Sequence, residues 1–109
     1  MIKIMEEKNR DLSLVYKFKR IFGLIPEQNW CIGHFKHGKK HCALGHLGAY
    51  NFDQTKWPIE VLNLRQLFKK FDLGIMGIND SINTLFNQKT PKQRILGALD
   101  YIEKKILEK

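Results

Sequence analysis

The fold class of this chain is decided by the stretch TPKQRILGALDYIEKKI, residues 90–106. Its first four residues form a capping box, with Thr90 as the N-cap, proline at the first helical position and Gln93 at the third. Apolar side chains then recur at the spacing of one helix face, at Ile95, Leu99, Ile102 and Ile106. The stretch therefore predicts an amphipathic helix that buries one face.

Two more segments show the same periodicity. Residues 11–22 end before Gly23 and have Asn9 or Asp11 as the expected N-cap. Their apolar stripe consists of Leu14, Val15, Phe18, Ile21 and Phe22. Residues 58–71 begin with a proline, which suits a first helical turn, and carry apolar side chains at Val61, Leu64, Phe68 and Phe71. Both segments are predicted to be helices.

A β-hairpin is expected between these two helices. Residues 29–35 alternate as in a strand, and residues 36–40 supply a polar turn around Gly38. Residues 41–50 begin extended and continue as a short helix, where Gly45 and Gly48 indicate a closely packed second backbone. Residues 73–78 are apolar with two glycines, and a strand and a tight connection remain open for them.

The composition predicts one α+β domain over residues 1–109, mainly helical, with about four helices around a short hairpin and a flexible start at residues 1–8. Lysines interrupt every apolar run, so no membrane span is expected. The first residues lack the apolar core of a secretory signal. Cys31 and Cys42 are interpreted as reduced thiols, and the cytoplasm is the expected location.

The chain carries a formal charge of +8, from 19 Lys and Arg against 11 Asp and Glu. An excess of this kind raises the rate of encounter with acidic molecules. It favours nucleic acid, a nucleotide or an acidic protein surface as the partner.

Residues 30–46 hold both cysteines and all four histidines, and three interpretations compete for this cluster. The first is a structural zinc site, because four borderline or soft ligands are available: Cys31, His34, Cys42 and His46. The expected strand argues against it, since side chains at positions 31 and 34 would point to opposite faces. No cofactor is therefore assigned, and zinc stays an alternative.

The second interpretation is a nucleophilic cysteine. Cys42 precedes a short helix, whose free amides and dipole would lower the pKa of the thiol. A histidine, His34 or His41, and the carboxylate of Asp80 would complete a hydrolase or transferase site. The alternatives are a buried structural thiol at Cys42 and a turn or helix cap at Asn79 and Asp80.

The third interpretation is a basic recognition loop at the tip of the hairpin. Its candidate binding residues are Trp30, Lys36, His37, Lys39, Lys40 and His41. Trp30 and its neighbour Phe35 are expected to supply aromatic stacking. The alternative is an exposed polar turn without a special role.

The order of four short motifs resembles a family of small bacterial and phage-encoded proteins of unknown function. The motifs are Trp30-Cys-Ile-Gly, Cys42-Ala-Leu-Gly-His-Leu, Ile78-Asn-Asp-Ser and Thr90-Pro-Lys-Gln-Arg-Ile-Leu. The resemblance spans residues 11–107 and implies a shared framework of Trp30, Gly33, Cys42, Gly45, Asn79 and Asp80. His46 departs from it, because a small alanine is usual after that glycine. Phage membership would imply a binder that blocks or sequesters a host component.

These observations favour a non-enzymatic binding or inhibitor module that engages an acidic partner, since no complete catalytic signature is present. A hydrolase or transferase built on Cys42 is the alternative, and a structural zinc domain is the second alternative.

Overall fold

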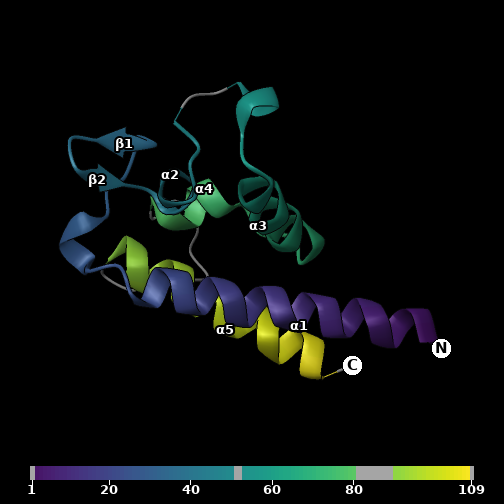
Figure 1. Cartoon of the computed structure of the whole chain (residues 1–109). Coiled ribbons are helices and arrows are strands. Elements are labelled where there is room, and N and C mark those ends of the chain that lie inside the picture. The colour runs from purple at the N-terminus through teal and green to yellow at the C-terminus, as the bar shows by residue number, and fades with distance from the viewer. Residues whose placement is uncertain (1, 51–52, 81–89, 109) are drawn as a thin grey trace.

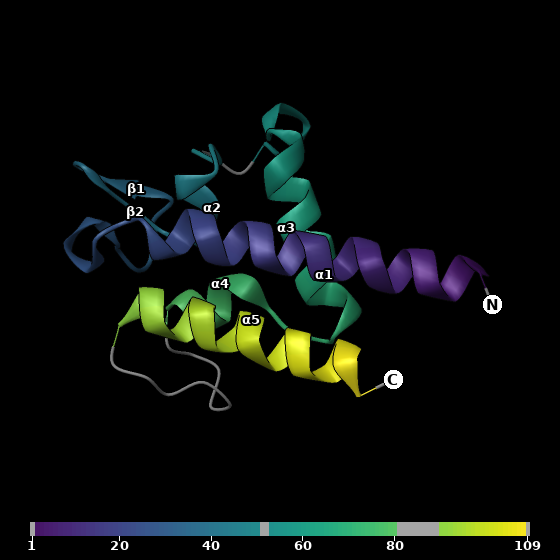
Figure 2. The same cartoon turned by 60° about the horizontal axis from the view of Figure 1, so that its bottom comes forward.

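The three long helices form the frame of the molecule. The computed structural model describes residues 2–50, 53–80 and 90–108. Helices α1 (Ile2–Gly23) and α5 (Pro91–Leu107) lie side by side and antiparallel (Figure 1), and α3 (Ile59–Lys70) runs across α1 (Figure 2). All three predicted apolar stripes face the core, whose fully buried side chains include Val15, Phe18, Phe22, Leu64, Phe68, Ile95, Leu99 and Ile102.

Thr90 is confirmed as the N-cap at the start of α5. The Thr90 side chain accepts a hydrogen bond from the Gln93 N–H at 3.1 Å, and Pro91 is the first helical residue. This cap satisfies one of the backbone donors that a helix N-terminus leaves unpaired.

The predicted start of the first helix is wrong. Helix α1 begins at Ile2, so it includes residues 2–8, which were expected to be a flexible start. Asp11 is a buried residue in the middle of the helix and not a cap, and Asn9 lies in the middle as well. The Asp11 carboxylate accepts a hydrogen bond from Lys70 Nζ of α3 at 2.8 Å. The same ammonium also pairs with Glu7, one turn earlier in α1. This contact with α3 is tertiary and cannot be read from local capping patterns.

The hairpin is shorter than expected and lies later in the chain. Its strands are β1 (Lys36–His37) and β2 (Lys40–His41), which pair antiparallel around Gly38, whose φ is 64°. The predicted strand over residues 29–35 is wrong: the 3-10 helix η1 (Glu27–Asn29) is followed by turns, and Trp30 forms a single parallel bridge with His41. Gly33 has a φ of 75°, a left-handed conformation that breaks an extended strand.

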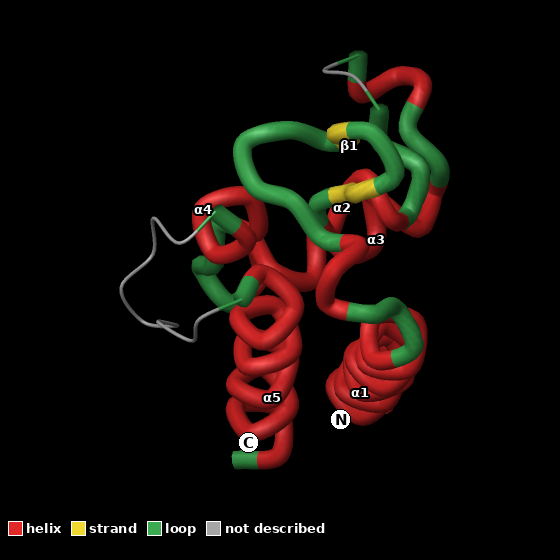
Figure 3. Tube along the Cα trace, turned by 90° about the vertical axis from the view of Figure 1, so that its left-hand side faces the viewer, coloured by secondary structure: helices red, strands yellow, loops and turns green. Residues whose placement is uncertain are grey.

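Two short helices complete the domain. Helix α2 (Ala43–His46) follows the hairpin as predicted. In addition, the 3-10 helix η2 (Gln54–Lys56) precedes α3. Helix α4 (Ile75–Asn79) occupies the segment that was expected to be a strand or a tight connection. That expectation is wrong because Ile75 and Ile78 are both buried on one helical face. The described residues thus contain five α-helices. The hairpin, α2, α3 and α4 form a second layer over the α1–α5 pair (Figure 3).

Ion pairs join the outer faces of the long helices. The Nζ atom of Lys19 in α1 lies 2.6 Å from Asp100 Oδ1 and 2.6 Å from Glu103 Oε1, both in α5. The Nζ atom of Lys17 lies 2.7 Å from Glu60 Oε1 of α3. Such partly exposed pairs contribute little stability each, and they leave the apolar stripes as the main source. Within the described ranges, no helix has the length and apolar character needed to cross a membrane.

Gly45 confirms the expected close approach of a second backbone. A Cβ atom at this position would lie 1.9 Å from the carbonyl oxygen of Phe35, which is too short for any non-bonded contact. The hairpin therefore rests directly on α2. Gly48 lies after the helix, with a φ of 109°, beside the ring of Pro58.

We expect the substitution Gly45→Ala to lower the free energy of unfolding by at least ~3 kcal/mol, the upper range for overpacking, because a carbonyl oxygen cannot move aside as a side chain can. Urea denaturation followed by circular dichroism measures the change. The control is Gly23→Ala at the end of α1, where an added Cβ meets nothing within 4 Å. Equal effects of the two substitutions would contradict the close packing.

Candidate functional site

The hairpin sorts its basic side chains onto two faces. In its register Lys36 is opposite His41, and His37 is opposite Lys40. Residues that are directly opposite each other share a face of a β-ribbon, whereas neighbours along a strand point to opposite faces. Lys36 and His41 therefore share one face, and His37 and Lys40 share the other.

Tyr50 lies next to the hairpin face that carries Lys36 and His41. The ammonium of Lys36 lies 5.9 Å from the centre of the Tyr50 ring, and the His41 ring centre lies 5.8 Å from it. Tyr50 is 61% exposed, so one side of its ring is open to a partner. This face thus combines a cation, an imidazole and an accessible aromatic ring.

The face with His37 and Lys40 borders an open groove of about 610 Å³. The groove runs between the hairpin and the first turn of α5, and the residues that line it are Trp30, Cys31, Ile32, His37, Lys40, Pro91 and Arg94. Its charged side chains are all basic. Its volume lies within the range of about 300–1,000 Å³ typical of small-molecule sites.

Uncompensated positive charge is concentrated at this end of the molecule. Residues 28–52 contain no Asp or Glu, while three lysines and all four histidines lie there. Several lysines on the helices, among them Lys17, Lys19 and Lys70, pair with carboxylates. Within the described part of the chain, the hairpin lysines at positions 36, 39 and 40 form no ion pair.

The aromatic residues expected to stack on a ligand do not lie on the surface. Trp30 and Phe35 are only 4% and 7% exposed. The Trp30 ring packs edge-on against Phe22 at 5.4 Å, and Phe35 packs against Trp57 at 5.9 Å. The stacking role predicted for these residues is therefore wrong. Tyr50, which the sequence analysis did not single out, is the exposed aromatic residue beside the hairpin.

Asn79 joins the segments that surround the groove. Its Oδ1 accepts a hydrogen bond from the Ala43 N–H at 3.0 Å, and its Nδ2 donates to the Cys31 carbonyl at 3.0 Å and to Asp80 Oδ1 at 2.8 Å. Asn79 is 1% exposed. The structural role weighed for it in the sequence is thus what the geometry shows: it caps α2 from another helix.

Arg94 connects α5 to the hydrogen-bond network around Asn79. Its Nε donates to the Ile78 carbonyl at 2.9 Å and its Nη2 to the Asn79 carbonyl at 2.7 Å. A cation at this position satisfies carbonyls that the C-terminus of α4 leaves unpaired and complements its dipole. Burial lowers the pKa of Arg94, with Asp80 acting in the opposite direction, and the guanidinium remains charged.

Cys42 lies where the sequence placed it, as the N-cap of α2. Its Sγ accepts a hydrogen bond from the Gly45 N–H at 3.4 Å. The expected lowering of its pKa is wrong: burial raises the pKa of this thiol and outweighs the hydrogen bonds from the backbone of Gly45 and Leu44. Only 5% of Cys42 is exposed.

Of the proposed partners of Cys42, Asp80 lies near the thiol, whereas His34 contacts other residues. The His34 ring lies 5.4 Å from the His37 ring, and the carbonyl of His34 accepts a hydrogen bond from Cys31 Sγ. The charge of Asp80 raises the pKa of both thiols and so opposes thiolate formation. The geometry therefore places a protonated thiol at Cys42, not an activated nucleophile.

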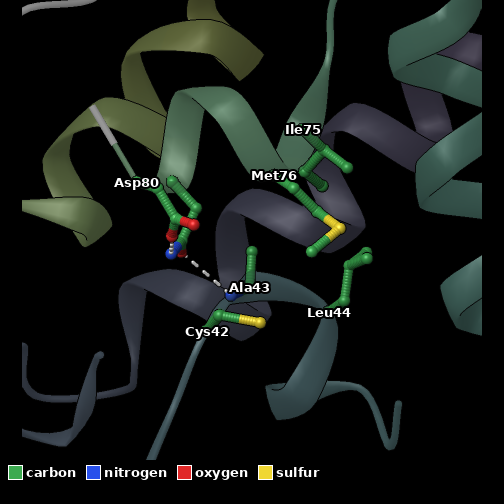
Figure 4. A pocket seen from close by; sticks show the side chains of 7 residues that line it. Cys42, Ala43, Leu44, Ile75, Met76 and Asp80 are labelled. Atoms are coloured by element: carbon green, nitrogen blue, oxygen red, sulfur yellow. Dashed lines mark hydrogen bonds between the residues drawn. The ribbon is translucent and has the colours of Figure 1, made fainter. Parts of the chain in front are cut away.

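Figure 4 shows the hollow beside Cys42. It has a volume of about 10 Å³, enough for about one water molecule, and Met76 and Leu44 are among the residues that line it. Asp80 lies at its edge, across from Cys42. A substrate has no room here.

The four candidate zinc ligands are engaged in other contacts. His46 packs against Trp30 with ring centres 4.7 Å apart, and burial together with the nearby His41 lowers the pKa of His46 to about 4. Its imidazole is therefore neutral at neutral pH. Among the described residues no group of three or more His, Cys, Asp or Glu side chains is arranged to hold a metal ion.

Four of the six residues that the resemblance implies as a shared framework are buried in this region. Trp30, Cys42, Gly45 and Asn79 are buried around the contact of the hairpin segment with α2 and α4. The sequence did not single out Arg94 or Pro91 as members of the site. Arg94 interrupts the apolar face of α5 one position before Ile95, and a buried arginine is rare enough to be a usable signal.

We expect Asn79→Ala to lower the free energy of unfolding by about 3 kcal/mol, because the Ala43 N–H and the Cys31 carbonyl would both lose their partner. Urea titration with an unchanged m-value measures this. Asn9→Ala, at an exposed position of α1, is the control and should change stability by less than ~0.5 kcal/mol. A similar small effect at both sites would rule out a central role for Asn79.

We expect Cys31 to react with iodoacetamide before Cys42, because Cys31 is partly exposed while Cys42 is buried. Both pKa values are raised, so both thiols should react more slowly at pH 7 than a free cysteine, and alkylation of Cys31 should accelerate as the pH rises above 9. Mass spectrometry of peptides after timed quenching measures each rate. Preferential labelling of Cys42 at neutral pH would instead favour the nucleophile hypothesis.

Comparison with known proteins gives no relative from which a function can be transferred: no protein family, curated protein or solved structure matches this chain. The resemblance described above rests on its four short motifs alone.

Proposed function

We propose that this chain is a binding module without catalytic activity, whose β-hairpin engages an anionic partner: nucleic acid, a nucleotide or an acidic protein surface. One observation carries the proposal, namely that Lys36, Lys39 and Lys40 project from a segment without carboxylates and form no ion pair within the described chain. Charges held together without compensation repel one another, and an anionic ligand removes that repulsion.

The surroundings of the hairpin support this use of its charge. The exposed ring of Tyr50 adds a surface on which a base or another planar group can stack. Gly45 and Asn79 hold the hairpin segment and α2 on the core, so the lysines project from a fixed backbone. A preorganised site loses less conformational entropy on binding than a mobile loop does.

The raised pKa values of both thiols support a function that does not use cysteine chemistry. Both cysteines are free, which suits a reducing compartment such as the cytoplasm. A small basic binder would act by occupying its acidic partner, in keeping with the phage relationship that the resemblance implies.

The test is the salt dependence of binding to a single-stranded oligonucleotide. Each phosphate contact on a single strand contributes about 0.7 to the slope of log K against log salt, so the variant with Lys36, Lys39 and Lys40 all changed to Gln should lose about 2 from that slope. Fluorescence anisotropy at several salt concentrations measures it. Poly-glutamate, titrated in parallel, distinguishes an acidic protein surface from nucleic acid as the preferred partner.

The matched control changes three exposed lysines outside the hairpin, Lys56, Lys69 and Lys104, to Gln. It removes the same net charge, so its slope should stay close to that of the parent chain. Equal losses in the two variants would mean that only net charge matters and not the hairpin. Absence of binding to both polymers at low salt would end the proposal.

A further inference from the structure

We infer that the groove between the hairpin and α5 is a site for a nucleoside phosphate, with the phosphate beside His37 and Lys40. The inference rests on the proposed function and narrows it to one ligand class and to one of the two hairpin faces. It is carried by the arrangement of donors around the groove and by a buried, unpaired indole N–H on Trp30, one of the residues that line it.

The cross-strand pair of His37 and Lys40 supplies the first donors. The two residues are directly opposite in the hairpin, so their side chains stand next to each other over the groove. An ammonium offers three donors and an imidazole at least one, and both are exposed here. The groove lining contains no carboxylate, which favours an anion over a cation as the ligand.

The opposite wall adds to the positive potential. Pro91 is the first residue of α5, a helix of 17 residues, so the positive end of its dipole borders the groove. The guanidinium of Arg94 lies one turn further on, where it is held by the carbonyls of Ile78 and Asn79. Arg94 thus contributes a fixed charge, while Lys40 and His37 remain available for direct contact.

Trp30 provides the independent observation. It lines the groove and is 4% exposed, yet its Nε1–H has no acceptor among the described residues. Buried donors in proteins are nearly always paired, so an unpaired one marks a place where a partner is missing. Because this nitrogen has no accessible surface, an acceptor atom of a ligand in the groove reaches it only when the Trp30 side chain shifts toward the groove.

The groove accepts more than an inorganic anion. Its volume of about 610 Å³ far exceeds that of a phosphate group, and Ile32 is 53% exposed in its wall. An apolar wall beside a cationic pair suits a ligand with a planar organic part and a phosphate. A nucleoside monophosphate has this combination of charge, planarity and size.

The experiment is a titration of the ¹⁵N-labelled full chain with adenosine monophosphate, followed by NMR. The two tryptophans give two indole N–H signals: Trp30 lies in the groove, and Trp57 lies apart from it against Arg65. We expect the Trp30 signal to shift with saturation while the Trp57 signal stays in place. Adenosine and inorganic phosphate, titrated separately, should each bind at least about tenfold more weakly, since each lacks one half of the contacts.

Two variants with the same charge change test the assignment to the groove. Lys40→Gln removes a cation from the groove and should weaken binding of adenosine monophosphate about tenfold, whereas Lys69→Gln, at an exposed position of α3 outside the hairpin and the groove, should change the Kd less than about twofold. A 5′-phosphorylated oligonucleotide, compared with its 5′-hydroxyl form, then tells whether a strand end can occupy the same site. Tighter binding of the phosphorylated form would identify the strand end as a source of the ligand, and equal binding would identify the free nucleotide.

Failure of the inference can be told apart from failure of the proposed function. If the oligonucleotide binds in a hairpin-dependent way but adenosine monophosphate leaves the Trp30 signal unmoved, the groove site is wrong and the binding function stands. If Lys69→Gln weakens nucleotide binding as much as Lys40→Gln, the groove is not the site. If no anion binds, both proposals are overturned.

Discussion

The side-chain amide of Asn79 makes the contacts on which the position of the hairpin segment and α2 depends. It satisfies a backbone donor of α2 and a backbone acceptor beside Trp30, and its own carbonyl is held by Arg94 of α5. A buried amide is tolerated only when its donors and acceptors are paired, so each of these segments has one allowed position relative to the others. The polar centre thereby fixes the hairpin segment against a core that apolar packing alone would leave less specific.

The position of the hairpin has electrostatic consequences. Residues 28–52 contain no carboxylate, whereas several carboxylates on the long helices neutralise lysines. The net charge of +8 is therefore not spread evenly. Because charges near a low-dielectric surface act over several ångströms, the uneven distribution makes the electrostatic potential more positive at the hairpin end of the molecule.

The sequence predicted the long helices and missed the details between them. The stripes of α1, α3 and α5 are buried as predicted, since a 3.6-residue period records burial directly. The alternation over residues 29–35 was misleading: in a strand, positions 30 and 35 would lie on opposite faces, yet Trp30 and Phe35 are both buried, because Gly33, with a φ of 75°, breaks the extended conformation. For the site, the basic residues and the capping position of Cys42 were predictable, but the pKa of that thiol was not, because it depends on burial by distant segments.

The amino-acid sequence by itself determined a mainly helical α+β domain, the capped start of α5 and the location of excess positive charge between residues 28 and 52. These properties follow from local periodicity, capping chemistry and composition. Only the tertiary structure decided which basic residues share a face, which aromatic ring is exposed and which polar side chains meet at Asn79. Each of these depends on contacts between residues far apart in the chain, whose packing no local pattern records.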